Sequence, residues 1–313
     1  MNILITGGYG FVGIQLVKDL SEEHDCYILD NEFSGEQRKS LLIGHDYMAI
    51  NCDIADQEAV SQVFQRHNFD VVIHLAAKHL IPWCDRNNAQ AYETNVVGTL
   101  NLLNSISEGT KFIFVSSAAV YAASNDSLKE DQSVLAPFDI YGLTKLHGEA
   151  VVELKCRQRS INYTIVRLFN VIGALESNSH ILPDICYQLR SGAKRIKLGN
   201  TDSFRDFIGV KDVSVGLRKI MNIQKNMEIV NLCSGNSHSM NEMIAELKFV
   251  SGIEFEIERD PLRQRKSDNP FIRGSTRKLE KLTNWKPDTS FSDNVRSAWE
   301  DEWTSENWGT VIK

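Results

Sequence analysis

The chain has 313 residues, of which 42% are hydrophobic and 24% are charged, close to the average for folded globular proteins. This composition excludes a disordered or collagen-like chain, and the length predicts one large or two modest domains that need no disulfides. The 34 Lys and Arg residues against 41 Asp and Glu residues give a formal net charge of -7. A nucleic acid is therefore a poor partner, because there is no overall positive field to attract its backbone.

The cysteines and the hydropathy indicate a cytoplasmic protein. The six cysteines contain no CxxC pair and are interpreted as reduced core residues: Cys26, Cys52, Cys84, Cys156, Cys186 and Cys233. No apolar run approaches the roughly 18 residues of a membrane span, so no membrane partner is expected. The N-terminus, MNILITGG, opens on a predicted strand and not on a basic leader.

The first half of the chain alternates short β-branched runs with longer amphipathic stretches, the pattern of strands and crossover helices in a parallel sheet. Runs such as DVVIHL and FIFV are continuously apolar, as expected for strands that are buried on both faces. Strands are predicted over residues 3–6, 26–30, 47–51, 70–76, 111–117 and 162–169. Helices are predicted over residues 11–20, 57–66, 89–107 and 141–157.

The pattern changes after Asn170. A polar segment precedes a predicted helix over 182–191, a strand over 229–233, a helix over 241–250, a charged stretch over 259–270, and helical patterns near Lys278 and Val295. We therefore expect an α/β fold with a Rossmann-type, doubly wound parallel sheet over residues 1–170 and a returning segment near 204–235. Residues 171–203 and 236–313 are expected to form a smaller, mixed α/β domain that binds substrate.

The segment TGGYGFVG (6–13) follows the first predicted strand directly and opens the first helix. Gly7, Gly10 and Gly13 match the spaced glycines of a dinucleotide-binding turn, which allow a tight turn, close approach to a pyrophosphate and close helix packing. The helix N-terminus would offer its amides and the positive end of its dipole to the phosphates. The triplet alone is weak support, since a glycine-rich turn without a ligand has the same appearance.

Asp30 strengthens this interpretation. It ends the second predicted strand, 17 positions after Gly13, where a dinucleotide site places a carboxylate for the adenosine ribose. NAD is favoured over NADP because Asp30 would repel a 2′-phosphate, although Arg38 would contradict this if it folded back over the ribose. Asp53, in NCDIAD, is either a second contact near the adenine or a turn or N-cap aspartate.

YGLTK places Tyr141 and Lys145 four residues apart, on one face of a helix. An ammonium beside a phenol favours the phenolate, so we expect Lys145 to lower the pKa of Tyr141 from about 10 toward neutrality. The pattern alone is common on helix surfaces, but Ser116 and Ser117 end the fifth predicted strand, at the edge where parallel sheets bind ligands. Ser117 would hydrogen-bond a hydroxyl while Tyr141 removes its proton and a hydride leaves the same carbon.

Together these motifs resemble the extended short-chain dehydrogenase/reductases of the nucleotide-sugar epimerase/dehydratase group. The resemblance covers nearly the whole chain and includes TGGYGFVG, LDN (29–31), HLAA (74–77), NVVGT (95–99), SSAAVY (116–121), YGLTK, RLFNVIG (167–173), LGNTDSFRDF (198–207) and NWKP (284–287). The C-terminal part, including LCSGNSHSMNEM and DPLRQRKSDNP, looks more like the enzymes of GDP-sugar metabolism.

The resemblance implies catalytic roles for Ser117, Tyr141 and Lys145, NAD as cofactor, and a nucleoside diphosphate sugar bound between the domains. The implied cofactor contacts are Gly7, Gly10, Phe11, Val12, Gly13, Asp30, Asn31, Asp53, Ile54, Leu75, Ala76, Ala77, Asn95, Tyr141 and Lys145. The implied substrate contacts are Ser117, Asn170, Arg205, Arg263, Arg265 and Asp268, with Arg263 and Arg265 as alternatives for one role.

An arginine fork suits a diphosphate, although an isolated arginine is more often part of a solvated ion pair. Lys266 stands where relatives often have proline, so recognition of the base stays open. No metal is expected, because the eight histidines include no HxH or HxxxH pair.

The relatives that dehydrate their sugar have an acidic pair after the active-site hydroxyl, and here these positions are Ala118 and Ala119. We therefore expect hydride exchange at sugar carbon 4 without dehydration. The favoured activity is a 4-epimerase that passes through a 4-keto intermediate on a GDP-sugar, and the alternative is a one-way GDP-sugar 4-ketoreductase or 4-dehydrogenase. A non-catalytic NAD-binding sensor or subunit would be expected to lack part of the Ser-Tyr-Lys set.

The same resemblance implies a homodimer that pairs through the helices predicted over 89–107 and 141–157. Apolar residues lie on more than one side of these helices, for example Val96, Leu100, Val151 and Leu154. They could equally belong to the core.

Overall fold

In the computed structural model the chain is described over residues 1–33, 36–176, 180–225, 227–260 and 269–301. Seven strands form the central sheet in the order β11-β6-β5-β4-β1-β2-β3, and each pairs with its neighbours in parallel. The strands are β1 (Asn2–Thr6), β2 (Asp25–Asp30), β3 (Tyr47–Asn51), β4 (Val71–His74), β5 (Lys111–Ser117), β6 (Tyr163–Leu168) and β11 (Glu228–Leu232). The strand order reverses between β1 and β4, which is the doubly wound arrangement of a Rossmann fold. The predicted fold class is confirmed.

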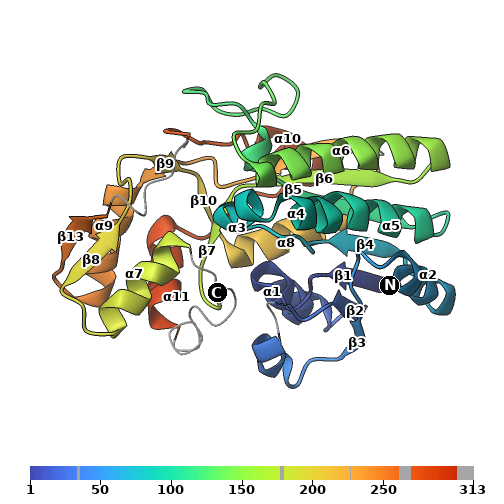
Figure 1. Cartoon of the computed structure of the whole chain (residues 1–313), viewed down its shortest axis with the longest axis horizontal. Coiled ribbons are helices and arrows are strands. Elements are labelled where there is room, and N and C mark those ends of the chain that lie inside the picture. The colour runs from blue at the N-terminus through green and yellow to red at the C-terminus, as the bar shows by residue number, and fades with distance from the viewer. Residues whose placement is uncertain (34–35, 177–179, 226, 261–268, 302–313) are drawn as a thin grey trace.

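Helices cover both faces of this sheet (Figure 1). On one face lie α1 (Phe11–Leu20) and α8 (Val210–Met221), and on the other lie α2 (Gln57–Arg66), α5 (Gly98–Ser105) and α6 (Ile140–Arg159). Side chains alternate between the two layers: Ile3 and Ile5 of β1 pack toward α1 and α8, whereas Leu4 packs toward the other three helices. Both faces are apolar, which explains the continuous hydrophobic runs in these strands.

The predicted helix over 89–107 consists of three pieces: α4 (Asn88–Tyr92), a π-helical turn (Glu93–Val97) and α5. The turn accommodates Asn95, whose buried amide is held by the backbone of Lys78 on the neighbouring loop. Gly98 directly follows the π-helical turn and begins α5. A Cβ added to Gly98 would lie 2.7 Å from the side chain of Ile54, so glycine allows α5 to approach the segment after β3 closely. A short helix, α3 (Ile81–Arg86), and helix α8 are further elements that the sequence analysis did not predict.

Elements of the C-terminal part surround a hydrophobic cluster of their own, at the left of Figure 1. They include α7 (Ile181–Arg190), β8 (Arg195–Leu198), α9 (Met240–Ser251), β13 (Glu256–Arg259) and α11 (Phe291–Glu300). The shorter strands are β7 (Asn170–Ile172), β9 (Phe204–Arg205), β10 (Phe207–Gly209) and β12 (His238–Ser239), and α10 (Arg277–Thr283) packs instead in the cluster that contains α1 and α8. Between these elements the chain returns to the first part of the molecule. Helix α8 packs in the same hydrophobic cluster as α1, and strand β11 pairs with β6.

All six cysteines lie in the described part of the chain, and each is buried with a free thiol, as predicted. Among the described helices, none has the length and apolar character required to span a membrane.

Candidate active site

A cleft of about 1120 Å³ lies at the carboxyl ends of the central strands. One side is lined by the glycine-rich turn after β1, by Asp30 after β2, and by the loop after β4. The other side is lined by residues of the C-terminal part, including Asn170 and Arg205. Parallel sheets bind ligands at this edge, next to the point where the strand order reverses.

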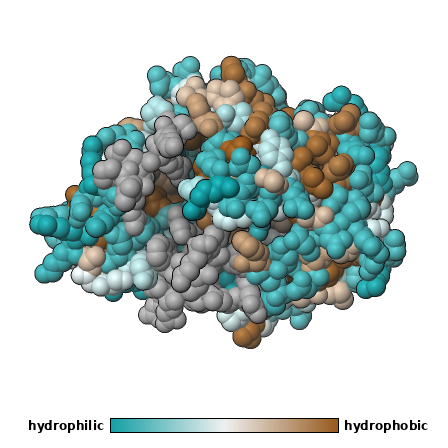
Figure 2. Space-filling view, viewed as in Figure 1, coloured by the Kyte–Doolittle hydropathy of each residue, from teal (hydrophilic) through white to brown (hydrophobic). Residues whose placement is uncertain are grey.

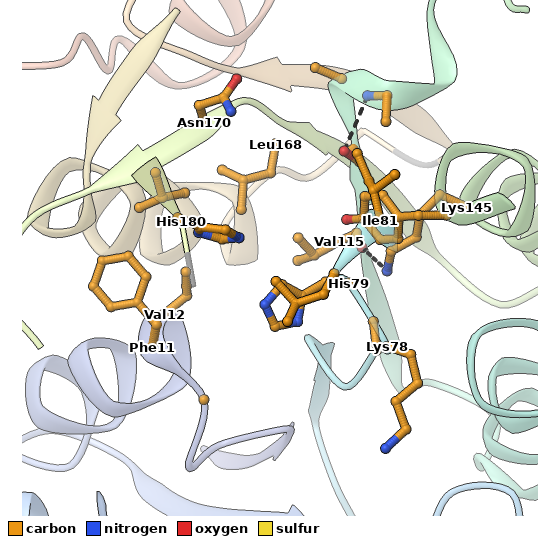
Figure 3. A pocket seen from close by; sticks show the side chains of 18 of the residues that line it. Phe11, Val12, Lys78, His79, Ile81, Val115, Lys145, Leu168, Asn170 and His180 are labelled. Carbon is orange, nitrogen blue, oxygen red and sulfur yellow. Dashed lines mark hydrogen bonds between the residues drawn. The ribbon is translucent and has the colours of Figure 1, made fainter. Parts of the chain in front are cut away.

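The glycine-rich turn leaves space that a side chain would fill. Gly7 has φ +69°, a conformation that favours glycine, and its amide donates to the carbonyl of Leu29 at 2.8 Å. A Cβ on Gly13 would lie 2.6 Å from the carbonyl oxygen of Gly7, so helix and turn are in close contact. Gly10 precedes α1 without a side-chain cap, and Phe11 and Val12 line the cleft, so the first amides of the helix are available to a phosphate (Figure 3).

Asp30 lies at the end of β2 and lines the cleft. Its carboxylate accepts the amides of Tyr9 at 3.2 Å and Glu32 at 2.7 Å, and burial raises its pKa. Arg38 is 1% exposed and lines the same cleft, near enough to Asp30 and Glu176 that both carboxylates favour its charged form. Burial nevertheless lowers the pKa of Arg38 to about 10, and Lys78, whose charged form Asp53 and Asp30 favour, lines the same cleft.

The predicted adenosine end of the cleft is built from the turns after β2, β3 and β4. Asn31 donates to Asp53 at 2.8 Å, and Asp53 also accepts the amide of Ala55 at 2.9 Å. Asp53 is therefore a turn aspartate that also lines the cleft, and its contact with the adenine stays a prediction. The remaining predicted contacts at this end, Ile54, Leu75, Ala76 and Ala77, also line the cleft.

Asn95 is placed differently from its predicted role as a cofactor contact. It is 1% exposed, is not among the residues described as lining the cleft, and exchanges two hydrogen bonds with the backbone of Lys78, at 2.8 and 2.9 Å. Its amide also donates to Thr144, next to Lys145, at 2.9 Å. Asn95 thus holds the loop after β4 against the helix that bears Lys145.

His79 is a cleft residue that the sequence analysis missed. Its Nε2 atom is buried and has no hydrogen-bond partner among the described residues, and its ring contacts the ring of His180 edge to face at 5.7 Å. Figure 3 shows both rings turned toward the open space between Phe11 and Lys145. A buried nitrogen without a partner is costly, so this atom is suited to a polar group of a ligand. In the sequence, its position directly after HLAAK (74–78) is the one feature that could have marked His79 as a cleft residue.

Ser117, Tyr141 and Lys145 meet in the cleft. Ser117 ends β5 and shares a hydrogen bond with the phenol of Tyr141, and Lys145 follows one turn later on α6. The ammonium of Lys145 donates to the carbonyl of Val115 at 2.8 Å. These residues come together because α6 crosses the carboxyl end of β5, where Gly142 approaches the carbonyl of Ala119 closely.

The structure does not show the expected lowering of the Tyr141 pKa. Burial raises it to about 12, and the hydrogen bond with Ser117 opposes this increase only in part. Burial also lowers the pKa of Lys145 to about 8, while the carboxylate of Glu149 favours its charged form. The protein's own groups therefore leave Tyr141 protonated at neutral pH, and a positive charge brought by a ligand would be needed to favour the phenolate.

Besides Ser117, two of the predicted substrate contacts lie in the cleft. Asn170 begins β7, and Arg205 is 8% exposed, with its guanidinium held by the carbonyls of Phe204 and Asn269 at 2.8 and 2.7 Å. Ala118 and Ala119 also line the cleft, beside Ser117. The other predicted contacts, Arg263, Arg265 and Asp268, lie outside the described residues.

Residues 3–233 match the NAD dependent epimerase/dehydratase family. The chain belongs to this family. It is an NAD-dependent enzyme, and the turn, the uncapped helix start, Asp30 and the unpartnered nitrogen of His79 fit a dinucleotide.

Individual members of the epimerase/dehydratase family are similar over almost the full length. A GDP-6-deoxy-D-mannose reductase of Pseudomonas aeruginosa is 28% identical, covering 95% of this chain and 97% of its own. A UDP-glucose 4-epimerase of Lactobacillus helveticus is 27% identical, covering 96% of each chain. The structure of a Thermotoga maritima UDP-glucose 4-epimerase with UDP-glucose matches with a TM-score of 0.87 and 27% identity, over 96% of this chain and 98% of that one.

Proposed function

We propose that this enzyme exchanges a hydride at carbon 4 of a nucleoside diphosphate sugar and is a 4-epimerase that passes through a 4-keto intermediate. The observation that carries the proposal is that Ser117, Tyr141 and Lys145 meet in one cleft, with Lys145 one turn from Tyr141 and only alanine at positions 118 and 119. A phenol and a hydroxyl can move and hold a proton, whereas alanine offers no acid or base to expel water.

The three side chains have separate roles in this proposal. Ser117 hydrogen-bonds the oxygen on carbon 4, and Tyr141 takes the hydroxyl proton during oxidation and returns a proton to that oxygen during reduction. Lys145 holds a positive charge one turn from Tyr141, and the phenolate also requires the positive charge that bound NAD+ brings. Bound NAD+ supplies the hydride acceptor and, once reduced, the donor. Epimerisation also requires the keto sugar to turn over between the two transfers.

A GDP-sugar is our proposed substrate class. The support is the resemblance of the C-terminal part to GDP-sugar enzymes, together with the name of the Pseudomonas aeruginosa relative. The UDP-glucose 4-epimerase of Lactobacillus helveticus is almost equally similar, so the test includes both nucleotides. We place the sugar nucleotide between the first part and residues 171–203 and 236–313, with Arg205 and either Arg263 or Arg265 at its diphosphate.

A one-way GDP-sugar 4-ketoreductase or 4-dehydrogenase is the second candidate. It is favoured by two relatives with such names, the reductase above and a GDP-6-deoxy-D-talose 4-dehydrogenase of Aggregatibacter actinomycetemcomitans that is 28% identical. Both candidates use the same half-reaction, so the Ser-Tyr-Lys geometry suits either.

The deciding experiment incubates the purified enzyme with NAD+ and GDP-, UDP-, CDP- and dTDP-sugars that carry deuterium at carbon 4, and in parallel with NADH and the corresponding 4-keto sugars. A 4-epimerase gives the inverted sugar with its deuterium retained and no net change in reduced-nicotinamide absorbance. Stoichiometric production or consumption of NADH would show a one-way 4-dehydrogenase or 4-ketoreductase and not a 4-epimerase. If none of these sugars reacts, hydride exchange on a nucleotide sugar is the wrong assignment.

We also infer a homodimer that pairs through α5 and α6. On this part of the surface Val97 and Leu154 are 44% and 55% exposed, and Figure 2 shows hydrophobic residues gathered over this region. A cytoplasmic location stays a prediction from the sequence.

A further inference from the structure

We propose that Glu149 is a positioning residue of the active site, which ties the helix bearing Tyr141 and Lys145 to the strand ending at Ser117 and supports the charge on Lys145. This inference rests on the proposed function for the roles of those three residues. Glu149 has no direct part in the proposed proton transfer.

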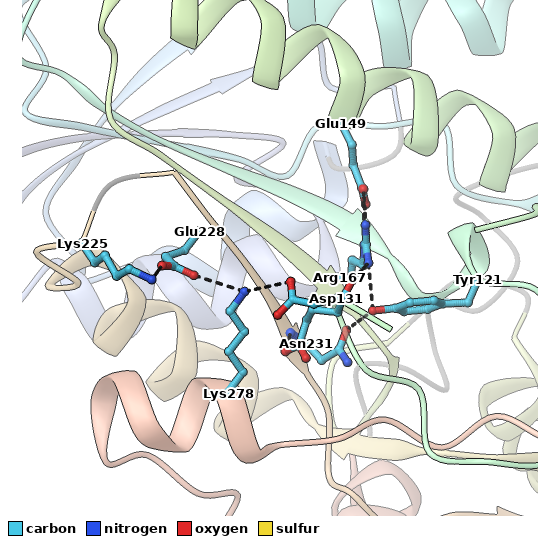
Figure 4. Close-up of polar contacts among 9 residues, drawn as sticks. Tyr121, Asp131, Glu149, Arg167, Lys225, Glu228, Asn231 and Lys278 are labelled. Atoms are coloured by element: carbon cyan, nitrogen blue, oxygen red, sulfur yellow. Dashed lines mark hydrogen bonds and ion pairs between the residues drawn. The ribbon is translucent and has the colours of Figure 1, made fainter. Parts of the chain in front are cut away.

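Glu149 is buried, with 4% of its surface exposed, two turns after Tyr141 on α6. One carboxylate oxygen accepts the hydroxyl of Ser116 at 2.6 Å, and the other accepts Nη2 of Arg167 at 2.8 Å. Nε of Arg167 adds a bond at 3.0 Å, and the guanidinium is 2% exposed (Figure 4). A buried carboxylate with this many donors has one well-defined orientation.

The neighbouring serines contact the same helix at two points, which links Glu149 to the chemistry. Ser116 donates to Glu149 in the middle of α6, and Ser117, the next residue of β5, meets Tyr141 at the start of that helix. The Ser116–Glu149 hydrogen bond and the Lys145–Val115 bond at 2.8 Å join the same helix to adjacent residues of β5. Together they set the separation of Ser117 and Tyr141, on which proton transfer depends steeply.

The far side of Arg167 makes this arrangement rigid. Its Nη1 donates to the phenol of Tyr121 at 3.0 Å, and that phenol donates to Asn231 of β11 at 2.7 Å. The same Nη1 donates to the backbone carbonyl of Glu130 at 3.2 Å. The cluster therefore joins α6, β6, β11 and the loop after β5 around one carboxylate (Figure 4).

The second effect of Glu149 is electrostatic. The titratable groups near Lys145 are Tyr141 and Glu149 on its own helix, Cys84 on α3, and His74 and His79 at and after the end of β4. The two histidines have pKa values lowered by burial and are neutral, and burial raises the pKa of the Cys84 thiol. The carboxylate of Glu149, four residues from Lys145 on α6, favours the charged form of Lys145 against the burial that lowers its pKa to about 8, and Lys145 shares this carboxylate with Arg167.

The first test compares Ser116→Ala with Thr110→Val. Each removes one buried hydroxyl that makes one hydrogen bond, but Thr110 lies before the other end of β5 and bonds the carbonyl of Phe69 at 2.8 Å. We expect Ser116→Ala to lower kcat about tenfold at unchanged KM, and Thr110→Val to leave kcat within about twofold of wild type. Unchanged kcat in Ser116→Ala, or equal losses in both variants, overturns the positioning role.

The second test measures the charge on Lys145 without substrate. NMR of protein labelled with 13C-lysine follows the titration of Lys145, identified by its loss in Lys145→Met. We expect a midpoint near pH 8 in the wild type and about one unit lower in Glu149→Gln, with the alkaline limb of kcat/KM shifted equally. An unshifted midpoint overturns the electrostatic role.

The two tests separate the failure of this inference from the failure of the proposed function. If the wild type acts on no nucleotide sugar, the proposed function fails while the titration still reports on Glu149. If Glu149→Gln does not fold because Arg167 loses its counter-charge, Ser116→Ala, which retains that ion pair, decides the inference.

Discussion

Tyr141 carries the largest predicted effect of any single residue. Tyr141→Phe removes only the hydroxyl that exchanges the proton, and the ring keeps its packing in the cleft. We expect kcat to fall by about 10²- to 10⁴-fold. Calorimetry should show nearly unchanged NAD affinity, and full activity in the variant would refute the acid/base role.

His79 allows a test of the cofactor site that needs no catalysis. Its Nε2 atom has no partner in the described structure, so the hydrogen bond to the backbone of Ala77 comes from its other ring nitrogen. Asn places a polar group near that second nitrogen, whereas Gln reaches the position of Nε2. If Nε2 contacts the dinucleotide, His79→Asn should weaken NAD binding by about 1 to 2 kcal/mol.

The matched variant His79→Gln should recover part of this binding energy. Titration calorimetry of the three proteins measures the differences directly. Equal NAD affinity in wild type and His79→Asn would exclude a contact at Nε2.

At the scale of elements, the active site depends on close contacts between helices and loops. Asn95 could be placed near the site from its motif, but its buried bonds to Lys78 and Thr144 depend on a π-helical turn that hydrophobic periodicity does not reveal. Helix α8 was missed as well. Tertiary packing, and not local pattern, fixes these details.

Gly98 tests the close approach of α5 to the segment after β3. In an exposed helix Gly→Ala is stabilising by about 1 kcal/mol. Here the added Cβ would lie 2.7 Å from Ile54, so we expect Gly98→Ala to destabilise the fold by about 1 to 3 kcal/mol.

Urea unfolding measures the sign of this change. Ile54→Ala removes the atoms in the way, so Gly98→Ala in that background should cost less. A stabilising Gly98→Ala in the wild-type background would show that the contact relaxes freely.

At the scale of the whole molecule, the predicted homodimer should sediment at twice the monomer mass of 35.4 kDa at micromolar concentration. The double substitution Val97→Glu and Leu154→Glu should shift the enzyme to monomer, because each carboxylate would be buried in the dimer interface without a partner. The control is Phe249→Glu on α9, a residue that is 75% exposed at the other end of the molecule (Figure 1). A wild-type monomer would rule out the dimer.

The net charge of -7 bears on how the whole molecule binds anionic ligands. A dinucleotide and a sugar nucleotide are both anions, yet the protein offers no overall positive field. In the proposed arrangement their binding rests on local groups, which are the start of α1 and arginines such as Arg205, itself almost fully buried. Local binding of this kind is less sensitive to salt than attraction by surface charge.

Short-range patterns were enough to predict the parallel sheet, the glycine-rich turn, Asp30 and the Ser-Tyr-Lys set, because the period or spacing of each pattern has a direct structural cause. The other groups that surround them follow from the packing of distant segments. Arg38, His79 and Glu149 come from separate elements, and burial among these elements sets the pKa of Tyr141 at about 12 and that of Lys145 at about 8. Desolvation depends on every neighbour in space, and spacing along the chain does not record those neighbours.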